Sequence, residues 1–138
     1  MTNNRIRILL GKLGLDGHER GVGMIAAWLR NAGMEVIYMG THQRPENMTK
    51  IAIEEDVDFI GLSFQGADHI PLTRLMIEQM KQDKLEGRPL VIGGNIPKRD
   101  IQILKNMGVA EVFTSGTSMD TIVHYFKTNA SDEVYKER

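Results

Sequence analysis

The stretch Gly11-Lys12-Leu13-Gly14-Leu15-Asp16-Gly17-His18-Glu19-Arg20-Gly21 lies between an apolar segment, Ile6 to Leu10, and a segment of helical periodicity, Val22 to Asn31. The apolar segment has the composition of a buried parallel strand. The quoted stretch is then a glycine-rich loop that contains one histidine. Because ligands of open α/β sheets bind beyond the carboxyl ends of the strands, the sequence predicts a ligand site in this loop.

Three side chains of the loop have the chemistry of a metal-ligand site. Asp16 and His18 are two residues apart, so in a turn the carboxylate can accept the imidazole Nδ1–H and leave Nε2 facing outward. A neutral imidazole oriented by a carboxylate is a common metal ligand. Lys12 can pair with Asp16 from behind. Gly14 and Gly17 allow backbone angles that other residues resist, so a bulky ligand can approach the main chain.

These residues carry a family resemblance. The spacing K-x-x-x-D-x-H-x-x-G is similar to that of the cobalamin-binding domain of adenosylcobalamin-dependent acyl-CoA mutases, the methylmalonyl-CoA mutase group, and is filled here by Lys12, Asp16, His18 and Gly21. Two further motifs of the family follow in order, Gly61-Leu62-Ser63 and Val91-Ile92-Gly93-Gly94. The resemblance extends from about Arg5 to Lys127.

Length and composition fit one globular domain. A chain of 138 residues can bury roughly 68–70% of its unfolded surface. A net charge of −1 gives no support to a nucleic-acid or membrane partner, and we expect neither. The absence of cysteine excludes disulfides, thiolate metal ligands and cysteine nucleophiles. The N-terminus has the pattern of neither a signal peptide nor a presequence. We expect a soluble, cytoplasmic protein.

Strand and helix patterns alternate five times. Strands are expected at residues 5–10, 35–39, 57–62, 89–92 and 109–113. Helices are expected at residues 20–31, 45–55, 71–80 and 97–105, and after residue 117. This alternation predicts an α/β fold, with a parallel sheet covered by helices on both faces. We expect a cobalamin-binding domain over residues 1–129 and a charged tail over residues 130–138.

The strand order cannot be obtained from periodicity. The resemblance implies a flavodoxin-like, doubly wound sheet of five strands in the order 2-1-3-4-5. In that order the switch point lies between the first and third strands. His18 follows the first strand and Ser63 the third, so both are expected to border one cleft.

The resemblance also implies what these residues do. His18 would displace the dimethylbenzimidazole base of cobalamin and bind cobalt from below, with adenosylcobalamin as the cofactor. The freed base and its nucleotide tail would enter the domain where Gly93 and Gly94 leave room, and Ser63 could offer a hydroxyl to the base. The predicted cofactor contacts are Lys12, Asp16, Gly17, His18, Gly21, Ser63, Gly93, Gly94, Gly116 and Thr117. Only His18 is a predicted metal ligand, and no residue is predicted to be catalytic beyond that ligation.

Several of these residues can also be explained without a cofactor. Tight turns can explain Gly93-Gly94 and the Gly116-Thr117 pair, since turns favour the same residue types. The family commonly has S-x-L after the third strand, whereas this chain has Ser63-Phe64-Gln65, which places the apolar contact of that leucine in question. Two further histidines, His42 and His69, lie in predicted loops, where we expect surface side chains.

The resemblance implies a radical carbon-skeleton isomerase. Mutases of this group bind acyl-CoA in a TIM barrel, a fold of typically ~250 residues. We therefore expect a small subunit that is inactive without a large TIM-barrel subunit, in a heterotetramer. Methylmalonyl-CoA, isobutyryl-CoA and 2-hydroxyisobutyryl-CoA remain open as substrates. One alternative is a corrinoid methyl carrier of a methyltransferase, which shares D-x-H-x-x-G. Another is a signalling receiver that binds no corrinoid.

Overall fold

Five strands alternate with five helices through residues 5–130, the part of the chain that the computed structural model describes. The strands are β1 (Arg7–Gly11), β2 (Glu35–Tyr38), β3 (Phe59–Phe64), β4 (Leu90–Gly94) and β5 (Glu111–Thr114). The helices are α1 (Arg20–Asn31), α2 (Pro45–Glu54), α3 (His69–Gln82), α4 (Lys98–Met107) and α5 (Met119–Asn129). The predicted alternation is confirmed. Apart from Ala130, the predicted tail lies outside the described residues.

The strands form one parallel sheet in the order β2-β1-β3-β4-β5. This is the predicted flavodoxin-like order. In the register, Gly11 at the end of β1 pairs with Leu62 of β3, and Ser63 pairs with Gly93 of β4. The ends of these three neighbouring strands therefore bring together the three motifs that are far apart in the sequence.

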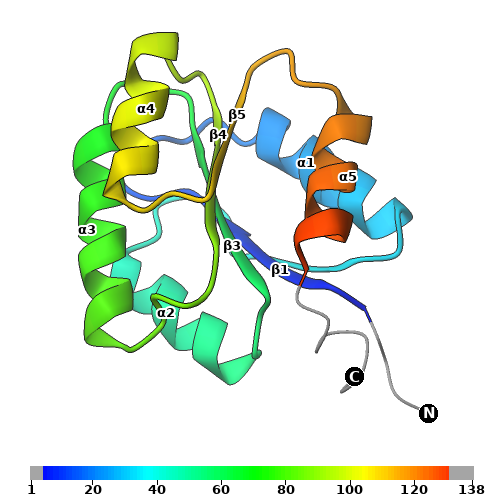
Figure 1. The fold of residues 1–138 in the computed structure, drawn as a ribbon, viewed down its shortest axis with the longest axis horizontal. Coiled ribbons are helices and arrows are strands. Elements are labelled where there is room, and N and C mark those ends of the chain that lie inside the picture. The colour runs from blue at the N-terminus through cyan, green and yellow to red at the C-terminus, as the bar shows by residue number, and fades with distance from the viewer. Residues whose placement is uncertain (1–4, 131–138) are drawn as a thin grey trace.

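Helices cover both faces of the sheet. Helices α1 and α5 pack on one face, and α2, α3 and α4 pack on the other (Figure 1). The buried side chains form one cluster on each face: Leu29 and Ile122 belong to the first, and Met48, Met76 and Leu104 to the second. Strand β3 is buried over its whole length because helices shield both of its faces, as expected for a central parallel strand.

Helix α3 begins earlier than the sequence pattern predicts. It starts at His69, and Pro71 lies inside its first turn. Proline is tolerated there because the first N–H groups of a helix have no partner within the helix. The expectation of a surface His69 is therefore wrong: the residue is 5% exposed. Strands β3 and β4 also run further than predicted, so Ser63 and Gly94 lie within strands.

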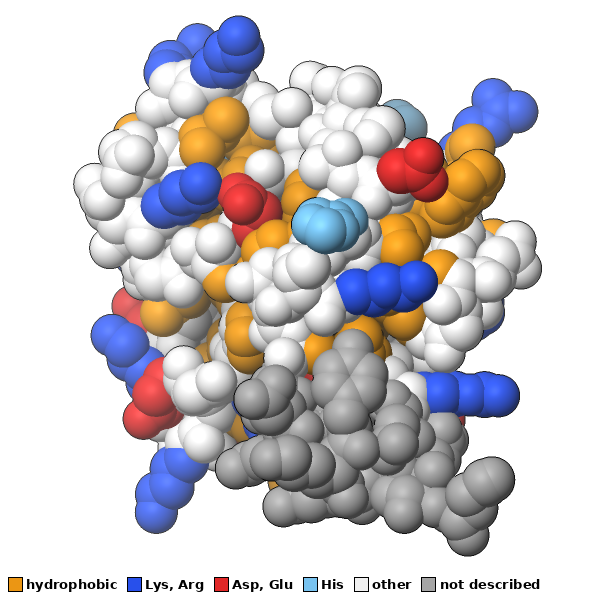
Figure 2. Space-filling view, turned by 45° about the vertical axis from the view of Figure 1, so that its right-hand side comes forward, with side chains coloured by type: hydrophobic (Ala, Val, Ile, Leu, Met, Phe, Trp, Pro, Cys, Tyr) orange, Lys and Arg blue, Asp and Glu red, His pale blue; other side chains and the backbone are white. Residues whose placement is uncertain are grey.

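Charged side chains of both signs lie on the face of the molecule that Figure 2 shows. Lys and Arg side chains are spread over this face, with acidic and apolar side chains among them. Among the described residues, no helix combines the length and the apolar character that crossing a membrane requires.

Candidate functional site

The loop between β1 and α1, residues 12–19, is called the histidine loop below. Its first half is fastened to the loop that follows β2. The amide of Lys12 donates to the Gly40 carbonyl at 3.1 Å, the Gln43 amide donates to the Lys12 carbonyl at 2.8 Å, and the Gly14 amide donates to the Gln43 carbonyl at 3.2 Å. Gly14 has φ of +75°, an angle that favours glycine. The base of the histidine loop is thus held by main-chain bonds.

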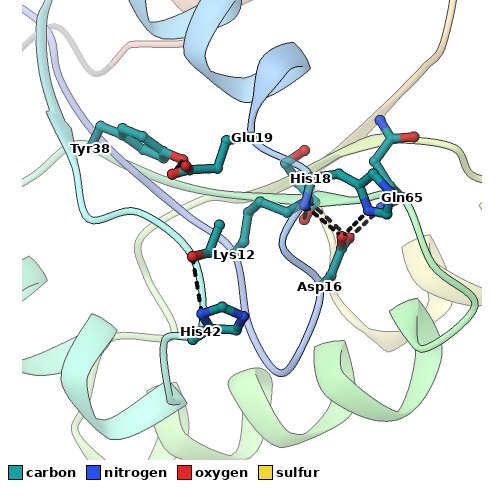
Figure 3. Close-up of polar contacts among 9 residues, drawn as sticks. Lys12, Asp16, His18, Glu19, Tyr38, His42 and Gln65 are labelled. Carbon is teal, nitrogen blue, oxygen red and sulfur yellow. Dashed lines mark hydrogen bonds and ion pairs between the residues drawn. The ribbon is translucent and has the colours of Figure 1, made fainter.

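Asp16 is the hub of the site (Figure 3). Its Oδ1 accepts from the His18 amide at 3.0 Å and lies 2.7 Å from the His18 Nδ1. Its Oδ2 accepts from the Gln65 amide at 2.8 Å and lies 3.0 Å from the Lys12 ammonium. Burial by itself raises the pKa of this carboxyl, but its hydrogen bonds outweigh burial and hold the pKa well below its usual range. Asp16 is therefore an ionised acceptor.

His18 is positioned as a ligand. Because an ionised carboxylate can only accept, the proton lies on His18 Nδ1, and a neutral ring then has Nε2 free to bind a metal. The side chain is 79% exposed, so a large ligand can reach it. The hydrogen bond from His18 to Asp16 and the ion pair of Asp16 with Lys12 are both as predicted.

Lys12 connects two strand ends. Its side chain is fully buried, and its ammonium donates to the Ser63 carbonyl of β3 at 3.1 Å in addition to pairing with Asp16. A buried ammonium needs such partners, because removing a charge from water is costly. The histidine loop is therefore tied to the end of β3.

A narrow apolar groove opens between the sheet and the helices α1 and α5. The volume of the groove is about 40 Å³, enough for one or two water molecules. The sheet side is lined by Leu10, Gly61, Leu62, Ser63, Val91, Ile92, Gly93 and Phe113, and the helix side by Val22, Ile25, Ile122 and Phe126. A larger apolar ligand would have to displace the helix side chains from the sheet to enter.

The two glycines of β4 lack side chains for different reasons. A Cβ on Gly94 would lie 2.0 Å from the Phe64 carbonyl oxygen, and Gly94 has φ of +118°, so the backbone itself requires glycine. A Cβ on Gly93 would lie 3.5 Å from the Phe113 carbonyl oxygen, an ordinary contact. Nothing in the sheet excludes a side chain at Gly93, but a side chain there would enter the groove.

Four of the predicted cofactor contacts remain to be located: Gly17, Gly21, Gly116 and Thr117. Gly17 lies in the histidine loop beside His42, and Gly21 lies in the first turn of α1, where a Cβ would come 3.8 Å from Gln65 Nε2. Gly116 and Thr117 lie between β5 and α5 and are not among the groove residues. Gly116 has φ of +95°, and the Thr117 hydroxyl donates to the Thr114 carbonyl. Turn geometry is sufficient to explain this pair, and its contact with the cofactor stays a prediction.

A comparison with protein families matches residues 6–123 to the B12-binding domain. The chain belongs to the B12-binding domain family. It is 42% identical over 118 residues to the pivalyl-CoA mutase small subunit of Xanthobacter autotrophicus, a match that covers 86% of this chain and 79% of that protein. It is 37% identical over 123 residues to the 2-hydroxyisobutanoyl-CoA mutase small subunit of Aquincola tertiaricarbonis, covering 89% and 90%.

A solved structure of low sequence identity shares the fold. The cobalamin-binding protein of Desulfitobacterium hafniense superposes with a TM-score of 0.75 at 19% identity, over 88% of this chain and 59% of that one. The receiver alternative is set aside, because the matched family is the B12-binding domain rather than a signalling one.

The residues fit the group that the B12-binding family name implies. The site has one exposed imidazole with a carboxylate behind it, and beside it a groove floored by glycine and apolar side chains. A neutral imidazole nitrogen suits cobalt, and the apolar lining would suit an aromatic base once the helix side chains move away from the sheet.

Two features of the candidate site were missed in the sequence. The Gln65 amide holds Asp16, yet any residue type except proline offers an amide, so composition gives no signal for it. Tyr38 at the end of β2 donates to Glu19 Oε1 at 2.8 Å (Figure 3). Burial first, and then the hydrogen bond and charge of Glu19, together raise the pKa of Tyr38 to about 12. The position of Tyr38 at a strand end was the available signal.

Proposed function

We propose that this chain is the cobalamin-binding small subunit of a two-chain, adenosylcobalamin-dependent acyl-CoA mutase. The observation that carries the proposal is the Asp16–His18 pair, at 2.7 Å, on the exposed edge of the sheet beside the groove. The names of the two small-subunit relatives, which align over most of their length, support the same assignment.

In this proposal His18 would hold the cobalt of the cofactor through Nε2. Asp16 holds the proton on Nδ1 and thereby fixes the tautomer and the direction of the ring. The amides of His18 and Gln65 keep Asp16 ionised, and Lys12 adds to this effect from the buried side. The carboxylate also makes the imidazole a stronger donor to the metal, since it stabilises positive charge on the ring.

The groove would take the displaced base and its nucleotide tail after the side chains of α1 and α5 that line it move away from the sheet. Gly61 and Gly93 form its bare floor, and Ser63 is the polar residue among its lining side chains. Gln65, which stands where the family commonly has leucine, is compatible with cofactor binding. It holds Asp16 through its main-chain amide, so that hydrogen bond does not depend on the side chain. Gly17 and Gly21 are proposed to permit close approach of the corrin to the histidine loop.

When bound, adenosylcobalamin would supply an adenosyl radical through homolysis of its cobalt–carbon bond. The chain's own residues bind and orient the cofactor, and a separate large subunit, proposed to be a TIM barrel, would bind the acyl-CoA. We propose a heterotetramer in the cytoplasm. The relatives are named for pivalyl-CoA and 2-hydroxyisobutanoyl-CoA, so a branched short-chain acyl-CoA is the proposed substrate class.

A corrinoid methyl carrier remains the second candidate, because such carriers share the D-x-H-x-x-G motif. The small-subunit names of the relatives favour the mutase. The two functions differ in the upper ligand of the cobalt. Comparing the affinities for adenosylcobalamin and methylcobalamin, with and without a mutase large subunit, separates them: a mutase subunit gains affinity for adenosylcobalamin when the large subunit is present.

The deciding experiment is electron paramagnetic resonance of the cobalt(II) form bound to the chain. With isotope-labelled histidine, the spectrum should show coupling to one histidine nitrogen, and the coupling should vanish in His18→Ala. His42→Ala is the matched control, since His42 lies beside Gly17 in the same region and is also exposed. Coupling to the nitrogen of dimethylbenzimidazole instead of histidine would contradict the proposal.

A further inference from the structure

A buried pair of ionisable side chains joins two helices behind the site. His69 is the first residue of α3 and is 5% exposed, and Asp100 lies in the first turn of α4 and is 9% exposed. The His69 Nε2 lies 2.7 Å from Asp100 Oδ2. The other ring nitrogen, Nδ1, is buried and has no hydrogen-bond partner among the described residues.

Packing two helices through this pair carries an unfavourable free energy of desolvation. An imidazole and a carboxylate both lose hydration when they are buried, and the buried Nδ1 makes no hydrogen bond that would offset this loss. Apolar side chains of similar volume often replace buried ionic pairs without loss of stability. The benefit of the pair must therefore come from the fixed distance and direction of its bond.

The bond fixes one end of the β3–α3 loop, residues 65–68. The other end is held where the Asn95 amide donates to the Phe64 carbonyl at 2.8 Å, and where the Gln65 amide donates to Asp16. All four loop residues are exposed, and over residues 5–130 none of their side chains makes a hydrogen bond. The course of the loop is thus set by its ends. Together with Gln65, the His69–Asp100 pair lines a hollow of about 380 Å³.

We propose that His69 and Asp100 are positioning residues for His18. Their bond holds the start of α3 against α4, so that the loop presents the Gln65 amide to Asp16 Oδ2. Asp16 held in this way directs its Oδ1 at the ring of His18. The inference rests on the proposed function for its meaning in cofactor binding, but the linkage itself belongs to the free chain.

The test uses the full chain without cofactor. In the double variant His69→Leu/Asp100→Leu, apolar side chains replace the pair and keep the helix packing, so the variant is expected to fold. Nuclear magnetic resonance should then show the Gln65 amide proton moved upfield and exchanging about tenfold faster, as for the loss of a charge-assisted hydrogen bond. His69→Gln, whose amide can donate to Asp100, should restore the wild-type signal.

The matched control is Thr73→Val. Thr73 lies one helical turn after His69, is fully buried and has an unpaired hydroxyl, yet it makes no bond to α4 among the described residues. This change alters the same face of α3 and should leave the Gln65 amide as in wild type. An unchanged Gln65 signal in the folded double variant would overturn the proposal. Failure of the double variant to fold would overturn it too, because the pair would then be structural.

The affinity for cobalamin provides the second measurement. The double variant should bind cobalamin about tenfold more weakly, the lower end of the effect of outer partners of a metal ligand. If wild type and the double variant both show coupling of cobalt to a histidine nitrogen and bind cobalamin with equal affinity, the positioning role is overturned. The proposed function would then stand. If the Gln65 signal moves while wild type shows no histidine coupling, the proposed function falls and the linkage survives.

Discussion

At the scale of single residues, Lys12 shows how a charge can be buried at low cost. Its ammonium reaches one carboxylate, Asp16, and one carbonyl, that of Ser63, and the side chain has no exposure at all. Methionine has a similar length and no charge. Replacing the lysine therefore separates the contribution of the ion pair from that of the buried stem.

We predict that Lys12→Met lowers the free energy of unfolding by about 3 kcal/mol, because Asp16 then keeps its charge without the buried cation. Urea unfolding at neutral pH measures the loss. The matched control is Glu46→Gln, which breaks the exposed ion pair with Arg44 and should cost less than about 1 kcal/mol. Equal losses in the two variants would contradict the role given to Lys12.

Tyr38 gives a prediction for high pH. Its pKa in the folded chain is about 12, raised first by burial and then by Glu19, whereas a tyrosine in the unfolded chain has a pKa of about 10. A raised pKa means that its contribution to stability is complete below the unfolded value and is lost as the pH rises through the folded one. Wild type should therefore lose more stability than Tyr38→Phe between about pH 10 and 12. Unfolding measured across that range checks this, and parallel curves would refute it.

At the scale of elements, the sequence predicted all ten helices and strands but misplaced several ends. The pattern at Pro71 suggested a helix start, because proline is common there; yet α3 begins two residues earlier and buries His69. Local pattern cannot reveal this burial, since it depends on Asp100 of α4 approaching from a distant part of the chain. The same holds for Gly94, whose need for glycine comes from the Phe64 backbone of a neighbouring strand.

The two glycines of β4 make a matched pair of predictions. Gly94→Ala should destabilise the fold by about 3 kcal/mol or more, since its Cβ would collide with the Phe64 carbonyl at a left-handed backbone angle. Gly93→Ala should change the free energy of unfolding by less than about 1 kcal/mol, because its Cβ meets only ordinary contacts. Thermal and urea unfolding of both variants measure the difference. A large loss in Gly93→Ala would remove the groove as the reason for that glycine.

At the scale of the whole molecule, one edge of the sheet supplies everything that the site needs. The histidine loop leaves β1, the Gln65 amide follows β3 and the bare glycines end β4. The alternation of elements predicted a parallel sheet, whereas the neighbourhood of β1 and β3 was expected from the family motifs. Each motif is local, and only the strand order makes the three motifs one site.

The last prediction concerns the groove that this order creates between the sheet and the helices α1 and α5. Cobinamide has the corrin ring of cobalamin but lacks the nucleotide tail, so only cobalamin should depend on the groove. Gly93→Ala places a methyl group on the groove floor. It should weaken cobalamin binding about tenfold, within the energy of burying an aromatic group, and change cobinamide binding less than about twofold.

Gly23→Ala is the control for this prediction, because Gly23 lies in α1 outside the groove, with no atom within 4 Å of an added Cβ. Spectrophotometric titration with both corrinoids measures the affinities. Gly23→Ala should leave the ratio of the two affinities at the wild-type value, since it alters neither the groove nor the histidine loop. If Gly93→Ala weakens the binding of both corrinoids equally, the tail does not enter this groove, and Gly61 and Gly93 serve only the packing of the sheet.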